Sequence, residues 1–256
     1  MDQAREEFGK TVKALQFFTR LTLPARIASL ADQSTGLNTA ACHFPVAGLA
    51  IGALAAVVFL ALSAFLPPVL ASGLTIAAGM VLTGALHEDG LADCADGLGG
   101  SSKAERVLEI MKDSRIGAFG AIALIFSVGL RWATLASLDP VTGALALTVC
   151  HSAARGSIAI ALATSTYARA SGTGSLVAPG ITTTELAICA AISVLPALAL
   201  LGFAGLIAAI AGWLAALLFL LWFERRIGGY TGDCLGAMEQ IAEIAILVSI
   251  TAMLAG

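Results

Sequence analysis

Three carboxylates lie at helical spacing in the segment His87–Gly97. Asp89, Asp93 and Asp96 are at positions i, i+4 and i+7, which on a helix places them within a narrow arc of one face. The apolar run Met80–Leu86 leads directly into them. An ionised carboxylate inside a bilayer costs at least about 2.5 kcal/mol, so a group of three needs a partner. A solvated helix end is the simpler reading, but three acids on one arc favour a site.

The chemistry that suits this cluster is binding of a hard cation. Carboxylates without thiols or matched imidazoles favour Mg²⁺, which commonly carries phosphate oxygens of a substrate. We therefore interpret the cluster as both catalytic and metal-binding, with Mg²⁺ as the cofactor. The residues assigned to both roles are Asp89, Asp93 and Asp96.

A second polar segment, Arg106–Gly120, contains three basic residues that can contact phosphate. Within it, Asp113 and Ser114 have two readings. They can belong to the site, or they can cap the start of the next span, since Asp and Ser are favoured at helix N-termini. The sequence leaves both open. The substrate-binding candidates here are Arg106, Lys112, Asp113, Ser114 and Arg115.

A third polar segment, Gly228–Glu239, is rich in glycine and enters a helix. Backbone N–H groups in such a loop can bind an anion. We expect Gly232, Asp233 and Glu239 to hold the nucleotide part of a substrate or to complete the metal shell, with Asp233 as a fourth metal ligand. The simpler reading is a flexible loop whose glycines pack against another helix. We further expect Asp233 to share one site with Asp89.

Isolated histidines, arginines and cysteines carry less information. His43 and His151 lie at or within apolar spans, where packing residues are commoner than ligands. Arg155 requires an anionic partner inside its span, and no partner is evident for Arg131. The five cysteines show no C-x-x-C pair and read as small membrane hydrophobes.

Composition shows what must position these groups. Hydrophobic residues make up 58% of the chain and charged residues 12%, against about 45–50% and 25% in soluble domains. A soluble chain of this length would expose large apolar patches. The predicted fold is therefore all-α: a polytopic integral membrane helical bundle. We expect one domain over residues 1–256 and no binding to nucleic acid.

Apolar runs of roughly 20 residues, enough to cross about 30 Å of hydrocarbon, define the spans. One run is too long for a single span and is divided at Gly202–Gly205 into two, and the last span is expected to begin before its apolar run. Residues 1–26 form an amphipathic helix on the membrane surface, with Pro24 ending it. The total is about seven spans within residues 44–254. The runs are Phe44–Leu66, Val69–Leu86, Gly117–Leu138, Val141–Ala163, Leu186–Phe223 and Ile241–Leu254.

The connections between spans differ in charge. The turns at Pro67-Pro68, Asp139-Pro140 and Gly202–Gly205 contain no Lys or Arg, whereas the remaining connections hold nearly all of them. Basic loops stay in the cytoplasm. The sequence therefore predicts a multi-pass protein of the cytoplasmic (inner) membrane, without a cleavable signal, whose polar segments face the cytoplasm.

The motifs resemble those of the cobalamin synthase family, the adenosylcobinamide-GDP ribazoletransferases. The H-x-D-G-x-A-D-x-x-D-G run and the M-x-D-S-R-x-G run together are specific, and the likeness covers nearly the whole chain. The connection Thr164–Thr184 resembles the family only loosely. The matching residues are Phe17–Leu21, His87–Asp93 with Asp96 and Gly97, Leu108–Gly117, and Thr231–Asp233 with Gly236 and Glu239.

The resemblance implies a membrane enzyme that joins α-ribazole, or its 5'-phosphate, to adenosylcobinamide-GDP and releases GMP. This is the last assembly step of the cobalamin nucleotide loop. A homo-oligomer, or association with other enzymes of that pathway, would be compatible with it. The alternative function is an ion-coupled secondary transporter, since intramembrane acids and broken helices also mark carriers. A non-catalytic scaffold would have no reason to gather three carboxylates at one helix end.

Overall fold

The structure is a computed structural model that describes residues 2–31, 36–169, 176–177 and 180–255. Helices dominate this part of the chain, and its one β-type pairing is the isolated bridge between Tyr167 and Tyr230. The all-α prediction is confirmed. In chain order the helices are α1 (Asp2–Phe18), α2 (Ala25–Ala28), the 3-10 helix η1 (Leu37–His43), α3 (Phe44–Ser63), α4 (Pro68–Thr83), α5 (Leu86–Gly100), α6 (Ala104–Ile110), α7 (Ala118–Ala136), α8 (Pro140–Thr164), α9 (Thr183–Ile227) and α10 (Gly232–Leu254).

Five helices are long and apolar enough to cross a membrane, and the α4–α5 pair makes a sixth candidate if it forms one broken span. Helix α9 is counted once there, yet its backbone leaves the helical region at Gly202. A Cβ on Gly205 would collide with the carbonyl of Ala197, so the chain reverses at this point into a hairpin. The predicted division of α9 is confirmed. The total of seven spans stays a prediction, because it depends on how the α4–α5 pair sits in the bilayer.

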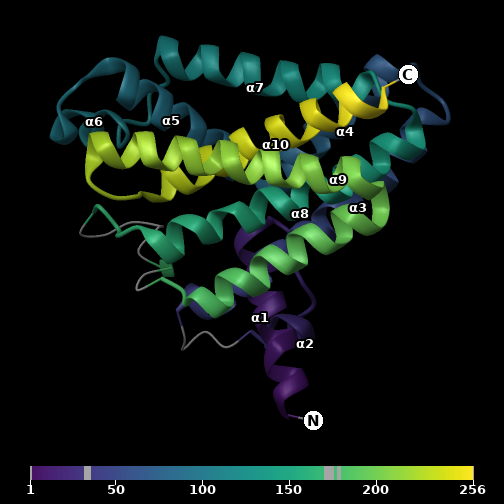
Figure 1. The fold of residues 1–256 in the computed structure, drawn as a ribbon, viewed down its shortest axis with the longest axis horizontal. Coiled ribbons are helices and arrows are strands. Elements are labelled where there is room, and N and C mark those ends of the chain that lie inside the picture. Colours follow the sequence, from purple (N-terminus) through teal and green to yellow (C-terminus); the bar gives the residue numbers. More distant parts are fainter. Residues whose placement is uncertain (1, 32–35, 170–175, 178–179, 256) are drawn as a thin grey trace.

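The long helices lie roughly parallel, and their connections gather at two ends (Figure 1). The hairpin turn of α9 and the C-terminus lie at one end, and α5, α6 and the start of α10 lie at the other. Helix α1 runs across the direction of the long helices, as a helix on the membrane surface would. It ends at Phe18 rather than at Pro24, which instead precedes α2. Its apolar face is partly covered by protein, since Val12 and Phe18 are buried.

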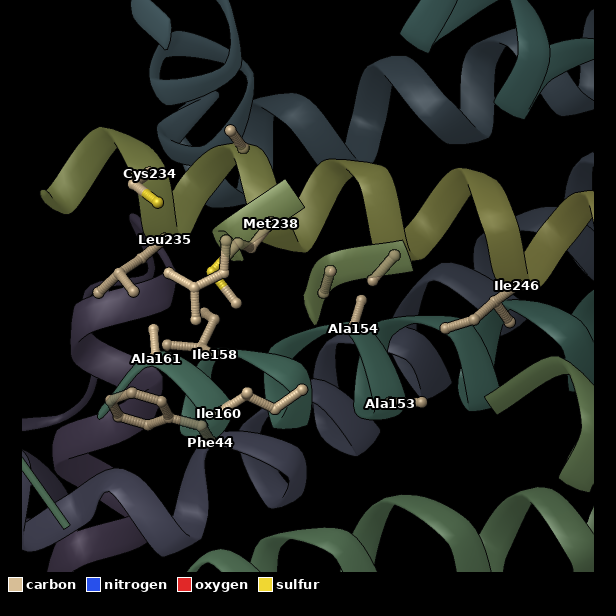
Figure 2. Packing of buried hydrophobic residues seen from close by; sticks show 14 of the residues in the cluster. Phe44, Ala153, Ala154, Ile158, Ile160, Ala161, Cys234, Leu235, Met238 and Ile246 are labelled. Carbon is tan, nitrogen blue, oxygen red and sulfur yellow. The ribbon is translucent and has the colours of Figure 1, made fainter. Parts of the chain in front are cut away.

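Helix α8 is the central element of the bundle, with 83% of its most apolar window buried. Small residues on α3 let the two backbones approach closely: a Cβ on Gly52 would lie 2.7 Å from the carbonyl oxygen of Leu147. Small residues at helix contacts are typical of membrane bundles. Helix α10 lies along the other side of α8, where Met238 and Leu235 face Ile158 (Figure 2). Helix α10 begins at Gly232, before the apolar run from Ile241, because Thr231 caps it through the Cys234 N–H.

A sharp bend between α4 and α5 aims the acidic segment across the end of the bundle. The two helices meet at 90°. Gly84 and Ala85 both have positive φ, at 67° and 53°, which ends α4 and restarts the chain in a new direction. For alanine this conformation costs about 1–2 kcal/mol. The acids therefore lie on a separate helix rather than on the end of the second span.

Candidate active site

Neighbouring residues of α5 point in different directions. Glu88 is buried, whereas Asp89 is exposed. Asp89 and Gly90 line a cavity of about 100 Å³ together with Gly232 and Asp233 from the start of α10. The structure therefore brings together two segments that the sequence separates by more than a hundred residues. Asp89 and Asp233, one from each segment, line the same cavity.

Close contact between α5 and α10 depends on glycine at two positions. A Cβ on Gly90 would lie 2.8 Å from the backbone oxygen of Asp233, and a Cβ on Gly236 would lie 3.3 Å from that of His87. The first distance is too short for any side chain, so Gly90 is required for this packing. The second is tight but leaves room for small shifts. These contacts fix where Asp233 stands relative to the acidic face of α5.

The carboxylates around the cavity mouth repel one another. Asp93 interacts unfavourably with Asp233, Asp89 and Asp96 and favourably with Arg169. Arg169 forms the ion pair that Asp233 makes, at 2.9 Å. One arginine thus stands against three acids, Asp89, Asp93 and Asp233. This local excess of negative charge fits the binding of a cation.

Asp96 has a different environment from the other acids of α5. Its Oδ2 accepts a hydrogen bond from the Gly117 N–H at 2.7 Å, and its Oδ1 accepts one from the Gly120 N–H at 2.8 Å. A Cβ on either glycine would collide with this carboxylate. Asp96 therefore caps the N-terminus of α7 from another helix, which satisfies donors that a helix start leaves free. A metal at Asp96 would compete with these bonds.

The basic segment lies beside Asp96 and is open to solvent. Arg106, Asp113 and Arg115 line a second cavity of about 330 Å³ with Asp96, while Lys112 and Ser114 are exposed outside it. Asp113 bonds the backbone and the guanidinium of Arg115. This bonding lowers the pKa of Asp113 to about 2.

The capping role that the sequence left open for Asp113-Ser114 falls instead to Asp96. The first residues of α7 have no side-chain cap from their own segment, and the bonds of Asp113 go to Arg115. The pair Asp113–Arg115 therefore remains available for contact with a substrate.

Inside the bundle, a network of ion pairs joins α5, α7, α8 and α10. Arg131 pairs with Glu88 at 3.0 Å and with Glu243 at 2.9 Å, which provides the partners that the sequence did not reveal. Arg155 pairs with Glu239 at 2.8 Å. His151 lies 2.6 Å from Glu243, and His87 lies 3.0 Å from Glu239. We call this set of seven residues the buried ion network: Glu88, Arg131, Glu239, Glu243, Arg155, His87 and His151.

Glu239 belongs to this network rather than to the group Asp89, Asp93 and Asp233, which we call the acidic cluster. Its side chain is fully buried and its carboxylate lies between Arg155, His87 and the amide of Gln240. It reaches the cavity only through His87, which lines it. The direct contact with a nucleotide that we predicted for Glu239 therefore has no support in this geometry.

Comparison with known proteins identifies the family. The CobS family, described as cobalamin-5-phosphate synthase, matches residues 10–251. The chain belongs to this family. A relative from Ralstonia nicotianae, named adenosylcobinamide-GDP ribazoletransferase, is 43% identical over 91% of each chain. Relatives with the same name from Ralstonia pickettii and Mesorhizobium japonicum are 40% and 41% identical over 96% and 95% of this chain, and over 96% and 93% of their own length. No solved structure matches.

The residues present fit a divalent cation best at the cavity mouth. The carboxylate oxygens of Asp89, Asp93 and Asp233 are hard ligands, which suit a divalent cation. Arg169 alone does not neutralise the negative charge of these three acids. A second set, His151, Glu239 and Glu243, has ligand atoms within 4.8 Å of one another. That set already pairs with Arg131 and Arg155, and two guanidinium groups oppose a cation. Asp89, Asp93 and Asp233 therefore fit a divalent cation better than His151, Glu239 and Glu243 do.

Arg169 is the site residue that the sequence did not single out. It lies in the connection after α8, the part of the chain that resembles the family only loosely, and no helical spacing relates it to an acidic residue. Its pairing with Asp233 depends on the loop before α10, where Tyr230 donates its N–H to the carbonyl of Thr166 and accepts from the N–H of Ala168. Only tertiary structure brings these two loops together.

Proposed function

We propose that this chain transfers the phosphocobinamide group of adenosylcobinamide-GDP to the hydroxyl of α-ribazole or α-ribazole 5'-phosphate. The hydroxyl oxygen attacks the phosphorus attached to cobinamide, the bond to the bridging oxygen breaks, and GMP leaves with that oxygen. The hydroxyl proton is lost to a base. Membership of the CobS family and the names of the relatives support this reaction. They also count against the carrier alternative.

The observation that carries the proposal is that Asp89 and Asp233 line one cavity and that Asp93 lies close enough to both to interact with them. Phosphoryl transfer between two large substrates needs positioning and neutralisation of phosphate charge rather than covalent chemistry by the protein. The cluster offers oxygen ligands, and Arg106 and Arg115 line the neighbouring cavity along α5.

Mg²⁺ is the proposed cofactor, held by Asp89, Asp93 and Asp233, and when bound it would neutralise the diphosphate and the leaving phosphate. Asp96 then contributes by holding the N-terminus of α7 beside the cluster. Arg169 limits repulsion at Asp233. Gly232 keeps the start of α10 open toward the cavity, which it lines.

We also propose that the site faces the cytoplasm from the inner membrane. Helices α5 and α6 and the start of α10 lie at one end of the bundle (Figure 1). The connections beside them contain Lys103, Arg106, Lys112, Arg115, Arg225 and Arg226. The positive-inside rule places that end in the cytoplasm.

The test is a turnover assay with purified protein in detergent. Protein is mixed with adenosylcobinamide-GDP, α-ribazole and Mg²⁺, and released GMP is measured. Activity should vanish in EDTA and return with Mg²⁺ or Mn²⁺, while Ca²⁺ should substitute poorly because of its longer bonds. Lack of GMP release with Mg²⁺ would overturn the reaction. Full activity in EDTA would overturn the metal alone.

A further inference from the structure

The cavity below the acidic cluster has an aromatic and aliphatic wall that the phosphate chemistry does not use. The ring centroids of Phe17 and Phe44 lie 6.4 Å apart with the planes nearly parallel, and Phe18 meets Phe44 edge to face at 4.8 Å. Figure 2 shows Leu235 of α10 and Ile158 of α8 pointing toward each other, with Phe44 near Ala161, and Leu235, Ile158 and Phe44 all line the cavity. The apolar residues lining the cavity are Phe17, Phe18, Phe44, Leu86, Ile158, Val177 and Leu235.

One polar side chain enters this wall. The His87 side chain is 5% exposed and lines the cavity, and its Nε2 has no hydrogen-bond partner. Its Nδ1 lies 3.0 Å from the Glu239 carboxylate. Because a carboxylate only accepts, Nδ1 carries a hydrogen, and in the neutral imidazole Nε2 is then an acceptor. A buried acceptor without a partner is unusual in proteins and indicates that a ligand supplies the donor.

We propose that this cavity binds the benzimidazole base of ribazole, with a ribose hydroxyl donating to His87 Nε2 and the attacking hydroxyl directed at the acidic mouth. This inference rests on the proposed function and extends it to one half of the substrate pair. It makes His87 a substrate-binding residue, oriented by Glu239 and Arg155 of the buried ion network.

Two bases of the substrates compete for this cavity, the benzimidazole of ribazole and the guanine of adenosylcobinamide-GDP. Their polarity favours benzimidazole. Benzimidazole is planar and mostly apolar, so aromatic and aliphatic walls suit it. Guanine carries amide and amine groups that would stay unpaired against these walls, at a cost of about 1–3 kcal/mol each. Guanine therefore fits better outside, along the basic segment.

The size of the cavity limits how much of the base it can enclose. A protein cavity of about 150 Å³ binds benzene, so this one, of about 100 Å³, is too small to enclose a whole ring. Asp89, which is exposed, lines it, so one edge of the two-ring base can enter while the ribose stays on the side of Asp89.

The first test fills the cavity. Leu235→Trp should raise the KM for α-ribazole at least tenfold and leave the KM for adenosylcobinamide-GDP within twofold. Val248→Trp is the matched control on the same helix, because Val248 is 41% exposed and lies outside the cavity.

A second variant, Phe17→Ala, removes part of the cavity wall and does not depend on whether the larger tryptophan ring disturbs folding. It should raise the KM for α-ribazole about three- to tenfold, and Phe126→Ala is its control on the exposed face of α7.

The second test separates base from hydroxyl with a probe that lacks the ribose. Free dimethylbenzimidazole should inhibit competitively against α-ribazole but not against adenosylcobinamide-GDP. Its inhibition constant should rise in Leu235→Trp and stay unchanged in His87→Gln, whereas the KM for α-ribazole should rise about tenfold in both. His43→Gln is the control, since His43 also pairs with a glutamate, Glu7, but does not line the cavity.

The outcomes distinguish this inference from the function on which it rests. Absence of GMP release by the wild-type protein would overturn the reaction itself. Normal turnover combined with an unchanged α-ribazole KM in both Leu235→Trp and Phe17→Ala would overturn the base site alone. Competition of the free base against adenosylcobinamide-GDP would assign the cavity to the other substrate.

Discussion

Glu88 and Asp89 are adjacent on α5, yet they belong to two regions with opposite electrostatics. Glu88 joins the buried ion network, where Arg131 and Arg155 offset the glutamates. Asp89 joins the acidic cluster with Asp93 and Asp233, where Arg169 is the one basic partner that the described contacts show. The same contrast recurs on α10 between Glu239 and Asp233.

The difference shows how charge is divided between architecture and chemistry. Buried charges are costly unless they are paired and hydrogen-bonded. In the buried ion network each glutamate is paired with an arginine of the same network. The cluster stands at the edge of the bundle, where water is available while no ligand is bound. It retains excess negative charge that an external cation can neutralise. Carboxylates therefore contribute to stability in the buried ion network and to ligand binding in the acidic cluster.

The largest effect is expected from breaking the network. Glu243→Gln removes the charge that faces Arg131, His151 and Arg155. Breaking a buried ion pair costs about 3–5 kcal/mol where it leaves a charge uncompensated. Arg131 keeps Glu88 and Arg155 keeps Glu239, so the cost should lie toward the lower end of that range, and the midpoint of thermal unfolding in detergent should fall accordingly. Glu6→Gln is the control, since Glu6 pairs with Lys10 at the surface, where such pairs contribute about 0–1 kcal/mol. Equal unfolding midpoints for the two variants would show that the network does not hold the bundle together.

Breaking the cluster should instead affect turnover. Asp89→Asn and Asp233→Asn keep side-chain size but remove charge, and each should reduce GMP release at least about 100-fold, the scale of losing part of a metal shell. Unfolding midpoints should stay close to that of the wild type. Asp139→Asn at the other end of the bundle, where Asp139 caps α8, should retain activity. Near-normal turnover in both cluster variants would remove them from the site.

The two regions were not equally visible in the sequence. The acidic cluster could be predicted because helical spacing relates Asp89 to Asp93 within one segment. The spans and the hairpin at Gly202 followed from run length and glycine position. The network joins four helices, so residue spacing contains no information on which glutamate meets Arg131. Helical spacing also grouped Asp96 with the cluster, although its partners lie on α7.

Asp96 offers a further test of this comparison, with a smaller expected effect. It lies on the same face of α5 as the acidic cluster, but its carboxylate caps α7 and so contributes to stability. Asp96→Asn weakens the acceptor for the Gly117 and Gly120 N–H groups, and losing a helix cap costs about 0.5–2 kcal/mol. We expect a modest fall in the unfolding midpoint and a smaller loss of turnover than in Asp89→Asn. The reverse order, with stability intact and turnover lost, would return Asp96 to the metal site.

The smallest effect concerns the exposed pair Asp113–Arg115, which lies outside both regions. Arg115 holds the pKa of Asp113 at about 2, below its usual value of 3.8. A lowered pKa means that the pair is fully formed above pH 3.8 and is lost as the pH falls through about 2. The unfolding midpoints of wild type and Asp113→Asn should thus keep a constant, small difference between pH 8 and pH 5. Arg115→Ala, which removes the same pair, should lower the midpoint by a similarly small amount while raising the KM for adenosylcobinamide-GDP, more strongly at low salt, because screening weakens exposed charge contacts. If Arg115→Ala leaves the KM for that substrate unchanged, the basic segment does not contact its phosphates. Phosphate binding would then be confined to the acidic cluster.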